Sequence, residues 1–377
     1  MNLRKVRAIA RKEYLHLIRD FRSLILAFII PLLLILLFGY ALSLDVDHIP
    51  TAVVDHDRTP ESRDFIRRLG ASIYFDVVAH PPSTAVLTDL LDHNEVILGI
   101  VIPPGWSADL KADRKSPLQV VIDGSDPNTA GNTRAFVTAF IAQANEHQLL
   151  DFLNRQGRER IRPPVEGRFR VWFNEDLESR NFIVPGIIAV IIMIVGALLT
   201  SLVIAREYEN GTMETIRALP VGAGEFCLGK AIPYFFITLV DVLVAILMGQ
   251  VLFGVVMKSG FWLMILASTI YIVVGLAIGL LISVKTKSQL VANQLAVLVT
   301  YLPSLLLSDF VFPQQNMPAP LKAVSKLVPA TYYIDILNGL YLRALSFREL
   351  WPSFLVLVVM AALLSALNIR ALKKEGL

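Results

Sequence analysis

The segment Gly224-Glu225-Phe226-Cys227-Leu228-Gly229-Lys230-Ala231 has the glycine and lysine spacing of a loop that cradles nucleotide phosphates. Such a loop needs Ser or Thr after the lysine to hold magnesium, and a strand before the first glycine. Here Ala231 follows the lysine and no strand precedes the segment. The sequence therefore does not predict nucleotide binding by this chain, and Lys230 is better explained as the cytoplasmic anchor of the apolar run that follows it.

Asp241 is the second residue whose side chain could take part in chemistry, because it is an acid near the middle of an apolar run. An ionised carboxylate at the centre of a bilayer costs about 2.5–3.5 kcal/mol on insertion scales, so it must face protein or water, be paired, or be protonated. One interpretation makes Asp241 a group on a transport pathway, facing substrate or a proton. The other makes it a carboxyl that hydrogen-bonds a neighbouring Ser or Thr.

The remaining reactive residues show no pattern typical of an enzyme. The six histidines lack ligand spacing, and no HExxH motif, catalytic acid pair or serine elbow occurs in a suitable setting. The single cysteine, Cys227, excludes a disulfide framework within the chain and a cysteine-cluster metal site. We therefore predict no catalytic residues, resident cofactor or metal.

The charged segment 206–214 lies between two apolar runs, one from Phe182 to Ala205 and one that starts after Lys230. The first run carries no charge over a length sufficient to cross a bilayer, which takes about 20 apolar residues. A charged helix held between two spanning helices cannot move without moving both. The segment is thus suited to a lever that carries a push from outside the membrane into it.

Composition places the chain among membrane proteins. It has 377 residues, of which 55% are hydrophobic and only 18% charged, against about 25% charged in soluble domains. The formal charge of +3 is too small to indicate nucleic-acid binding. The sequence predicts an α-helical polytopic membrane protein.

The apolar runs and their basic flanks predict the membrane topology. Residues 1–22 form an expected amphipathic helix on the cytoplasmic membrane face, because apolar residues recur there at helical spacing among seven basic ones. The first span, 23–44, is too long for a secretory signal and is read as an uncleaved anchor. Five more spans are expected at 182–205, 231–256, 261–284, 290–307 and 350–369. Alternate threading through six spans then places both termini and the basic cluster Lys285/Lys287 in the cytoplasm.

Two segments outside the spans have distinct character. Residues 45–180 alternate expected strands (52–54, 73–78, 97–102, 118–122 and 169–173) with expected helices (60–69, 83–93, 104–111 and 129–155), which predicts an extracytoplasmic α/β domain between spans one and two. Residues 308–349 are interrupted by prolines yet apolar, and are expected to form short helices that lie in or re-enter the outer leaflet.

Gly275 and Gly279 form a small-xxx-small motif for close helix packing.

The chain resembles the permease subunits of type-2 ABC exporters, and more narrowly the bacterial multidrug-efflux-type permeases with a large periplasmic insertion. The resemblance covers nearly the whole chain, and its most specific motif is the stretch from Ala205 to Glu214. Further motifs are Lys12-Glu13, Arg19-Asp20, the stretch from Asp123 to Ala130, Pro185-Gly186, Pro303-Ser304, Ser308 to Pro313, Met317-Pro318, and Pro329 to Tyr333. The family often has Gly where Asp309 stands, although Asp tolerates a left-handed backbone better than most residues.

The resemblance implies partners and roles. It implies a bacterial inner-membrane location, a separate cytoplasmic ABC ATPase that binds the ATP, a second permease copy or paralogue, and a periplasmic adaptor as a further candidate partner. Residues 206–214 would be a coupling helix seated in a cleft of the ATPase, with Gly211-Thr212 ending one helix and capping the next. The implied coupling residues are Arg206, Glu207, Tyr208, Glu209, Gly211, Thr212 and Glu214.

Two functional hypotheses follow. In the first, the chain is an exporter permease, not itself an enzyme, that moves drugs, lipids or other amphipathic cargo outward by alternating access. In the second, it is a membrane sensor or scaffold whose outer domain binds a ligand or an adaptor. A receptor needs a cytoplasmic output domain, and the sequence contains none.

Overall fold

A computed structural model describes the chain except for residues 1, 42–47, 113, 156–171 and 175–177. The chain divides into two compact units, one formed by Met1–Ser43 with Val171–Leu377 and the other by Leu44–Arg170. Each unit has its own hydrophobic core.

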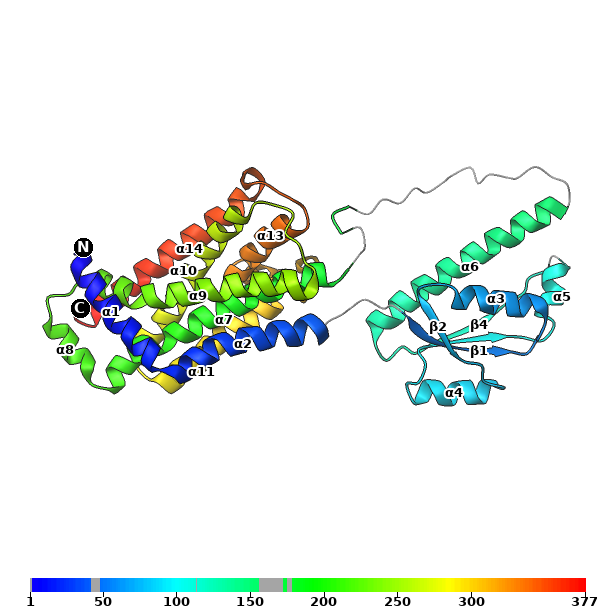
Figure 1. Cartoon of the computed structure of the whole chain (residues 1–377), viewed down its shortest axis with the longest axis horizontal. Helices are drawn as coiled ribbons and strands as arrows, with labels where there is room; N and C mark the ends of the chain where they lie inside the picture. Colours follow the sequence, from blue (N-terminus) through cyan, green and yellow to red (C-terminus); the bar gives the residue numbers. More distant parts are fainter. Residues whose placement is uncertain (1, 42–47, 113, 156–171, 175–177) are drawn as a thin grey trace. The chain divides into compact units, whose positions relative to one another are not determined.

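The first unit is a helical bundle (Figure 1). Among the described residues, five of its helices are long and apolar enough to cross a membrane. These five helices are α7 (Arg180–Glu209), α9 (Ala223–Phe253), α10 (Phe261–Thr286), α11 (Gln289–Leu306) and α14 (Phe347–Lys374). The others are α1 (Leu3–Arg19), α2 (Phe21–Ala41), α8 (Thr212–Ala218), the 3-10 helix η1 (Gln314–Asn316), α12 (Ala319–Ser325) and α13 (Pro329–Tyr341).

Helix α7 is the centre of the bundle. Its apolar window is 83% buried, against 56% or less in the other four long apolar helices. Two hydroxyl contacts fix it to α10: the Tyr271 hydroxyl donates to the Ala189 carbonyl oxygen at 3.1 Å, and Ser283 Oγ accepts from the amides of Ile204 and Ala205. These hydrogen bonds couple the end of α7 to α10, so the two helices should move together.

The small-residue motif on α10 packs as the sequence predicts. A Cβ built on Gly279 would lie 2.3 Å from the Ala197 carbonyl oxygen, and one on Gly275 would lie 3.5 Å from Met193 Sδ. The Thr200 hydroxyl donates to the Leu276 carbonyl oxygen at 3.0 Å across the same contact. The two glycines thus bring the backbones of α7 and α10 together.

Several predicted boundaries differ from the structure. Helix α9 begins at Ala223, eight residues before the predicted span, because Lys230 is neutralised by partners inside the bundle and does not end the helix. Of the predicted strand 169–173, residues 169–171 lie outside the described residues, and Trp172 and Phe173 are not in a strand. Asp309 adopts the left-handed φ of +71°, the backbone conformation that glycine takes most easily.

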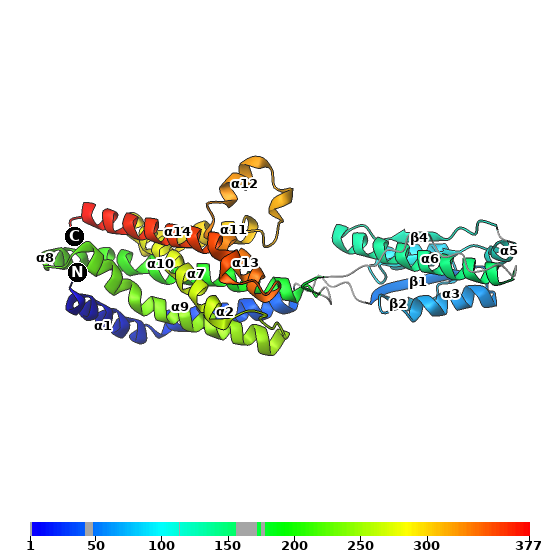
Figure 2. The ribbon, with the colours of Figure 1, turned by 90° about the horizontal axis from the view of Figure 1, so that it is seen from above.

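The ends of the bundle are distinct. Both termini lie at the same end of the first unit, beside α8, in both views (Figures 1 and 2). The segment 308–349 contains η1, α12 and α13; α13 is packed into the bundle, and Figure 2 shows α12 standing away from it. The Ser353 hydroxyl donates to Asp335 Oδ2 at 2.6 Å and joins α14 to α13.

The second unit contains a four-stranded sheet of order β2-β1-β3-β4, in which β3 and β4 pair antiparallel and the other pairs are parallel. Its strands are β1 (Ile49–Asp55), β2 (Phe75–Ala79), β3 (Leu98–Ile102) and β4 (Gln119–Ile122), and its helices are α3 (Pro60–Gly70), α4 (Thr84–Asp92), α5 (Trp106–Lys111) and α6 (Pro127–Arg155). One core lies between the sheet and α3, α5 and α6; a smaller one lies under α4. The Thr59 side chain caps α3 by accepting from the Ser62 amide, with Pro60 at the first helical position.

Candidate functional site

Residues 206–214 do not form one helix. Helix α7 ends at Glu209, Gly211 takes the left-handed φ of +70°, and α8 starts at Thr212. The break at Gly211 agrees with its predicted role, because glycine adopts positive φ without steric cost. The predicted cap by Thr212 is not formed: Gly211 is the N-cap, and the Thr212 hydroxyl donates to the Glu207 carboxylate instead.

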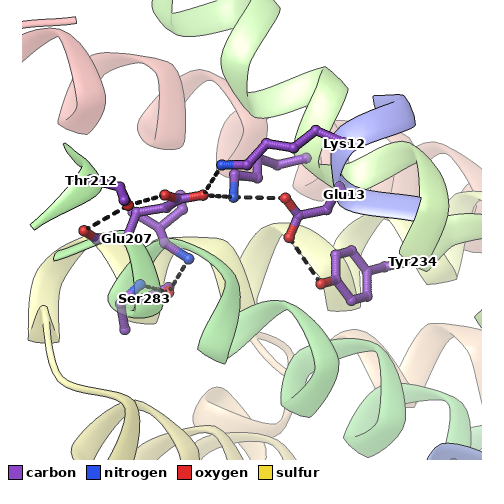
Figure 3. A network of polar contacts seen from close by, with 9 residues as sticks. Lys12, Glu13, Glu207, Thr212, Tyr234 and Ser283 are labelled. Carbon is purple, nitrogen blue, oxygen red and sulfur yellow. Dashed lines mark hydrogen bonds and ion pairs between the residues drawn. The ribbon is translucent and has the colours of Figure 1, made fainter. Parts of the chain in front are cut away.

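Glu207 is the buried centre of the site (Figure 3). It is 7% exposed, and its Oε1 lies 2.8 Å from Lys12 Nζ on α1 and 2.5 Å from Lys230 Nζ on α9. The second oxygen, Oε2, accepts from Thr212 at the start of α8. One carboxylate thus joins the first helix of the chain, the end of α7, the start of α8 and α9.

Glu13 extends this cluster along α1. Its Oε2 lies 2.7 Å from Lys230 Nζ, and its Oε1 accepts a hydrogen bond of 3.1 Å from the Tyr234 hydroxyl (Figure 3). Lys230 is 2% exposed and Glu13 3%, so Lys230 does not reach solvent as the anchor that the sequence suggested. Two lysines and two glutamates balance in charge. We call the buried residues Glu13, Glu207 and Lys230, together with Lys12, whose side chain is partly exposed, the buried charge cluster.

Arg206 and Tyr208 contact other parts of the chain. Arg206 Nη2 lies 3.3 Å from Asp20 Oδ2, at the junction of α1 and α2. The Tyr208 hydroxyl donates to Glu375 Oε2 at 3.1 Å, just after α14. The same carboxylate oxygen lies 2.8 Å from Lys287 Nζ and 3.3 Å from Arg217 Nη2. The hydrogen bond from Lys287 lowers the pKa of the Glu375 carboxyl, and desolvation opposes this shift. The hydrogen bond from Tyr208 and the positive charge of Arg217 lower the same pKa further.

Glu209 is the link to α11. Its Oε1 accepts from the backbone amide of Gln289 at 2.8 Å, and its Oε2 from the Gln289 side chain at 2.5 Å. Gln289 is the first residue of α11, so the carboxylate lies at the positive end of that helix dipole.

Helix α8 is held on one side and open on the other. Met213 is 1% exposed and packs into the bundle core, whereas Glu214 is exposed and makes no ion pair among the described residues. Leu219, just past the helix, is 53% exposed. The start of the chain contacts the loop after α8 and the first turn of α9, since Lys5 donates to the Pro220 carbonyl oxygen and the Asn2 amide donates to Glu225 Oε1. The free face of α8 is the part of the predicted lever that is open to a partner.

Asp241 is separate from this site. It lies on α9 more than two turns beyond Lys230 and is 5% exposed. Its Oδ2 has no hydrogen-bond partner among the described residues, and the Thr238 hydroxyl nearby is directed to the Tyr234 carbonyl oxygen. A hydrogen bond to a neighbouring Ser or Thr is therefore not what accommodates this carboxyl in the described part of the chain.

Sequence reasoning placed the predicted residues in one region but missed their partners. The missed partners are Lys12, Glu13, Asp20, Lys230, Tyr234, Lys287, Gln289 and Glu375. The motifs Lys12-Glu13 and Arg19-Asp20 were the available signals, because an acid beside a base in an otherwise basic amphipathic helix needs a partner of its own. The other pairings join residues far apart in sequence, and no local pattern reveals them.

Comparison with known proteins supports a transporter. A family model described as "ABC-2 family transporter protein" matches residues 21–370. The chain is 32% identical to the Probable multidrug ABC transporter permease YbhS of Escherichia coli (strain K12), over 91% of this chain and 89% of that protein. It is 26% identical to the Probable multidrug ABC transporter permease YbhR of the same strain, over 93% of this chain and 94% of that one. With this match over most of its length, the chain belongs to the ABC-2 family of transporter proteins.

Proposed function

We propose that the chain is the transmembrane permease subunit of an ATP-driven ABC exporter, worked by a separate cytoplasmic ATPase. The observation that carries this proposal is the set of contacts at the end of α7. Residues 206–209 and 212 are tied to α1, α9, α11 and the segment after α14, while Glu214 on α8 is left exposed. This is the arrangement of a lever with one free face and several attached helices.

In this proposal six helices span the inner membrane: α2 and the five long apolar helices. An even number of crossings puts both termini on one side, and both termini lie at the same end of the first unit. That end is cytoplasmic by the rule that basic residues stay inside, which fits Lys287 and the lysines at the end of α14. Residues 45–180 then lie outside the membrane, and α12 and α13 belong to the outer side.

The mechanism follows from the attachments. When two ATPases close on ATP, each pushes a copy of α8. Gly211 transmits the push to α7, and the buried charge cluster makes α1 and α9 move with it. A second permease copy or paralogue completes a central path, which these movements open outward. ATP is bound by the ATPase alone.

The cargo follows from the chemistry of the path and from the relatives. Two relatives are named as multidrug permeases, and an apolar bundle suits drugs, lipids or other amphipathic molecules. The extracytoplasmic unit would receive cargo or dock a periplasmic adaptor protein. Asp241, buried on α9 without a partner among the described residues, is the residue we propose for the pathway.

Affinity purification of the tagged chain from its native membrane tests the proposal. An ABC ATPase should copurify, and the complex should hydrolyse ATP. Glu214→Lys should reduce hydrolysis severalfold, because it reverses the exposed charge on α8. Glu349→Lys, at the opposite end of the bundle on α14, serves as the matched control and should leave hydrolysis unchanged. If no ATPase copurifies, or if Glu214→Lys hydrolyses at the normal rate, the proposal fails.

A further inference from the structure

Helix α1 runs alongside α9 in the same direction. The Asn2 amide donates to Glu225 Oε1 in the first turn of α9, and Glu13 Oε1 accepts from the Tyr234 hydroxyl further along α9. Helix α9 is long and apolar enough to cross a membrane. Helix α1 therefore follows a spanning helix inward from the end of the bundle that holds both termini.

The first half of α1 presents three exposed arginines on one face. Arg4, Arg7 and Arg11 are spaced three and four residues apart, so they lie above one another along the helix. All three are exposed, and their guanidinium groups make no ion pair or hydrogen bond within the described part of the chain. The two lysines of α1, by contrast, are bonded to other segments of the bundle. We call these three residues the arginine row.

The same face of α1 becomes apolar in its second half. Tyr14, Leu15 and Ile18 continue the helical spacing of the arginine row, and each side chain is about half exposed. The opposite face, with Val6 and Leu17, is buried in the bundle. The apolar stripe that the sequence predicts is thus used largely for packing within the protein, and the exposed face passes from basic to apolar along the helix axis.

Helix α9 shows a parallel change in its exposed residues. Its first turn contains the charged Glu225, whereas Ile232, Phe236 and Val240 further along are exposed and apolar. At a bilayer surface the polar headgroups give way to hydrocarbon over a short depth. Both helices therefore fit a membrane boundary at which the arginine row lies among headgroups and residues 14–18 of α1 lie among acyl chains.

We propose that the arginine row binds the phosphate groups of anionic phospholipids, with phosphatidylglycerol as the type, in the leaflet at this end of the bundle. Guanidinium groups stay charged at physiological pH and bind phosphate oxygens through paired N–H donors. A surface of anionic lipids attracts basic segments that lie beside a spanning helix. The inference rests on the proposed function only in placing the bundle across a membrane, and it requires neither the ATPase nor a cargo.

Photolabelling of the purified full chain in phosphatidylcholine nanodiscs tests this binding. The probe is phosphatidylglycerol with a diazirine on its headgroup, and the matched control probe is phosphatidylcholine with a diazirine on its headgroup. At equal mole fraction, the phosphatidylglycerol probe should label residues 4–11 more strongly than the control probe. Phosphatidylglycerol with the diazirine at the start of an acyl chain should instead label residues 14–18.

A double variant, Arg7→Gln with Arg11→Gln, tests the arginine row itself. Each basic residue near an anionic surface changes binding about fivefold, so half-maximal labelling of α1 should need about 25-fold more phosphatidylglycerol probe. The matched control removes two exposed arginines of the second unit, Arg63→Gln with Arg134→Gln, and should leave the labelling of α1 unchanged.

Three results would overturn the assignment: equal labelling of α1 by the two headgroup probes in the unmodified chain, undiminished labelling in the Arg7/Arg11 variant, or an equal loss in the control variant. The first comparison uses the unmodified chain and so decides the matter even if a variant fails to fold. Lipid binding here by a chain that copurifies no ATPase would defeat the proposed function and leave this inference standing.

Discussion

Lys230 Nζ lies 2.5 Å from Glu207 Oε1, and the two side chains are 2% and 9% exposed. This pair joins α9 to the end of α7 inside the protein rather than at its surface. A charge pair this well buried is held by its geometry, because neither group can be solvated if the other moves away. The connector between α7 and α9 is therefore attached at both ends, which is the property that a lever needs.

Lys230→Met should destabilise the chain by about 3–5 kcal/mol, the usual cost of removing one partner of a buried pair. The variant leaves Glu13 without an ion-pair partner among the described residues and leaves Glu207 with Lys12 alone. Thermal unfolding in detergent, followed by the loss of the monodisperse peak in size-exclusion chromatography, measures the effect. Lys12→Met is the matched control: the Lys12 side chain is 45% exposed, so its removal should cost only about 0–1 kcal/mol. Equal losses in the two variants would contradict the buried role of Lys230.

Gly211→Val should weaken the coupling between α8 and α7 without a steric clash with neighbouring atoms. No atom lies within 4 Å of a Cβ at this position, so the cost comes from the φ of +70° alone. A left-handed conformation costs a non-glycine residue about 1–2 kcal/mol, and more for a β-branched one. We expect a lower rate of ATP hydrolysis in the complex with the ATPase. Gly211→Asn should fall between Val and the wild type, and the prediction is wrong if Val and Asn behave alike.

Glu375 should make stability depend on pH in the acidic range. Its pKa is lowered in the folded chain by the hydrogen bond from Lys287, with Tyr208 and Arg217 adding to it. A lowered folded-state pKa means that the stabilisation is fully present above the ordinary carboxyl pKa and is lost as pH falls through the lowered value. The difference in thermal stability between wild type and Glu375→Gln should thus be largest at neutral pH and disappear in acid. A difference that stays constant with pH would refute this account of Glu375.

Gly279→Ala should disrupt the contact between α7 and α10. The added Cβ would lie 2.3 Å from the Ala197 carbonyl oxygen, a backbone atom that cannot turn aside. Overpacking of this kind typically costs about 1–3 kcal/mol. Gly196→Ala, on the facing side of the same helix pair, is the control, because its Cβ would come no closer than 3.7 Å to any neighbour. Thermal unfolding of both variants should show a loss for Gly279→Ala only.

The long apolar helices could be predicted from sequence because a helix that crosses a bilayer needs about 20 consecutive, mostly apolar residues. The boundaries of α10 and α11 lie within two residues of the predicted spans. The start of α9 was missed because Lys230 interrupts the apolar run and so sets the N-terminal limit of the predicted span. The helix begins before Lys230 because Glu13 and Glu207 pair with this lysine inside the bundle. The first span remains a prediction, since α2 is not among the helices that the described residues identify as long and apolar enough.

The site could be predicted in position but not in its contacts. The run of charges between two apolar stretches predicted where the connector between α7 and α9 lies, and Gly211 predicted the break between α7 and α8. However, Arg206, Glu207 and Glu209 were expected to face a partner protein, and in this structure they bind Asp20, Lys230 and Gln289. Those pairings join α7 to residues from 23 to 186 positions away in sequence. Local periodicity and spacing therefore cannot predict them.

The central claim is that α8 meets a cytoplasmic ATPase. A photoactivatable amino acid placed at Glu214, in the chain expressed in its native membrane, tests it most directly, with the same residue at Glu349 as the control. The account predicts that position 214 forms a crosslinked product containing an ABC ATPase and that position 349 forms none. Absence of such a product at 214, or an equal yield at 349, would contradict it.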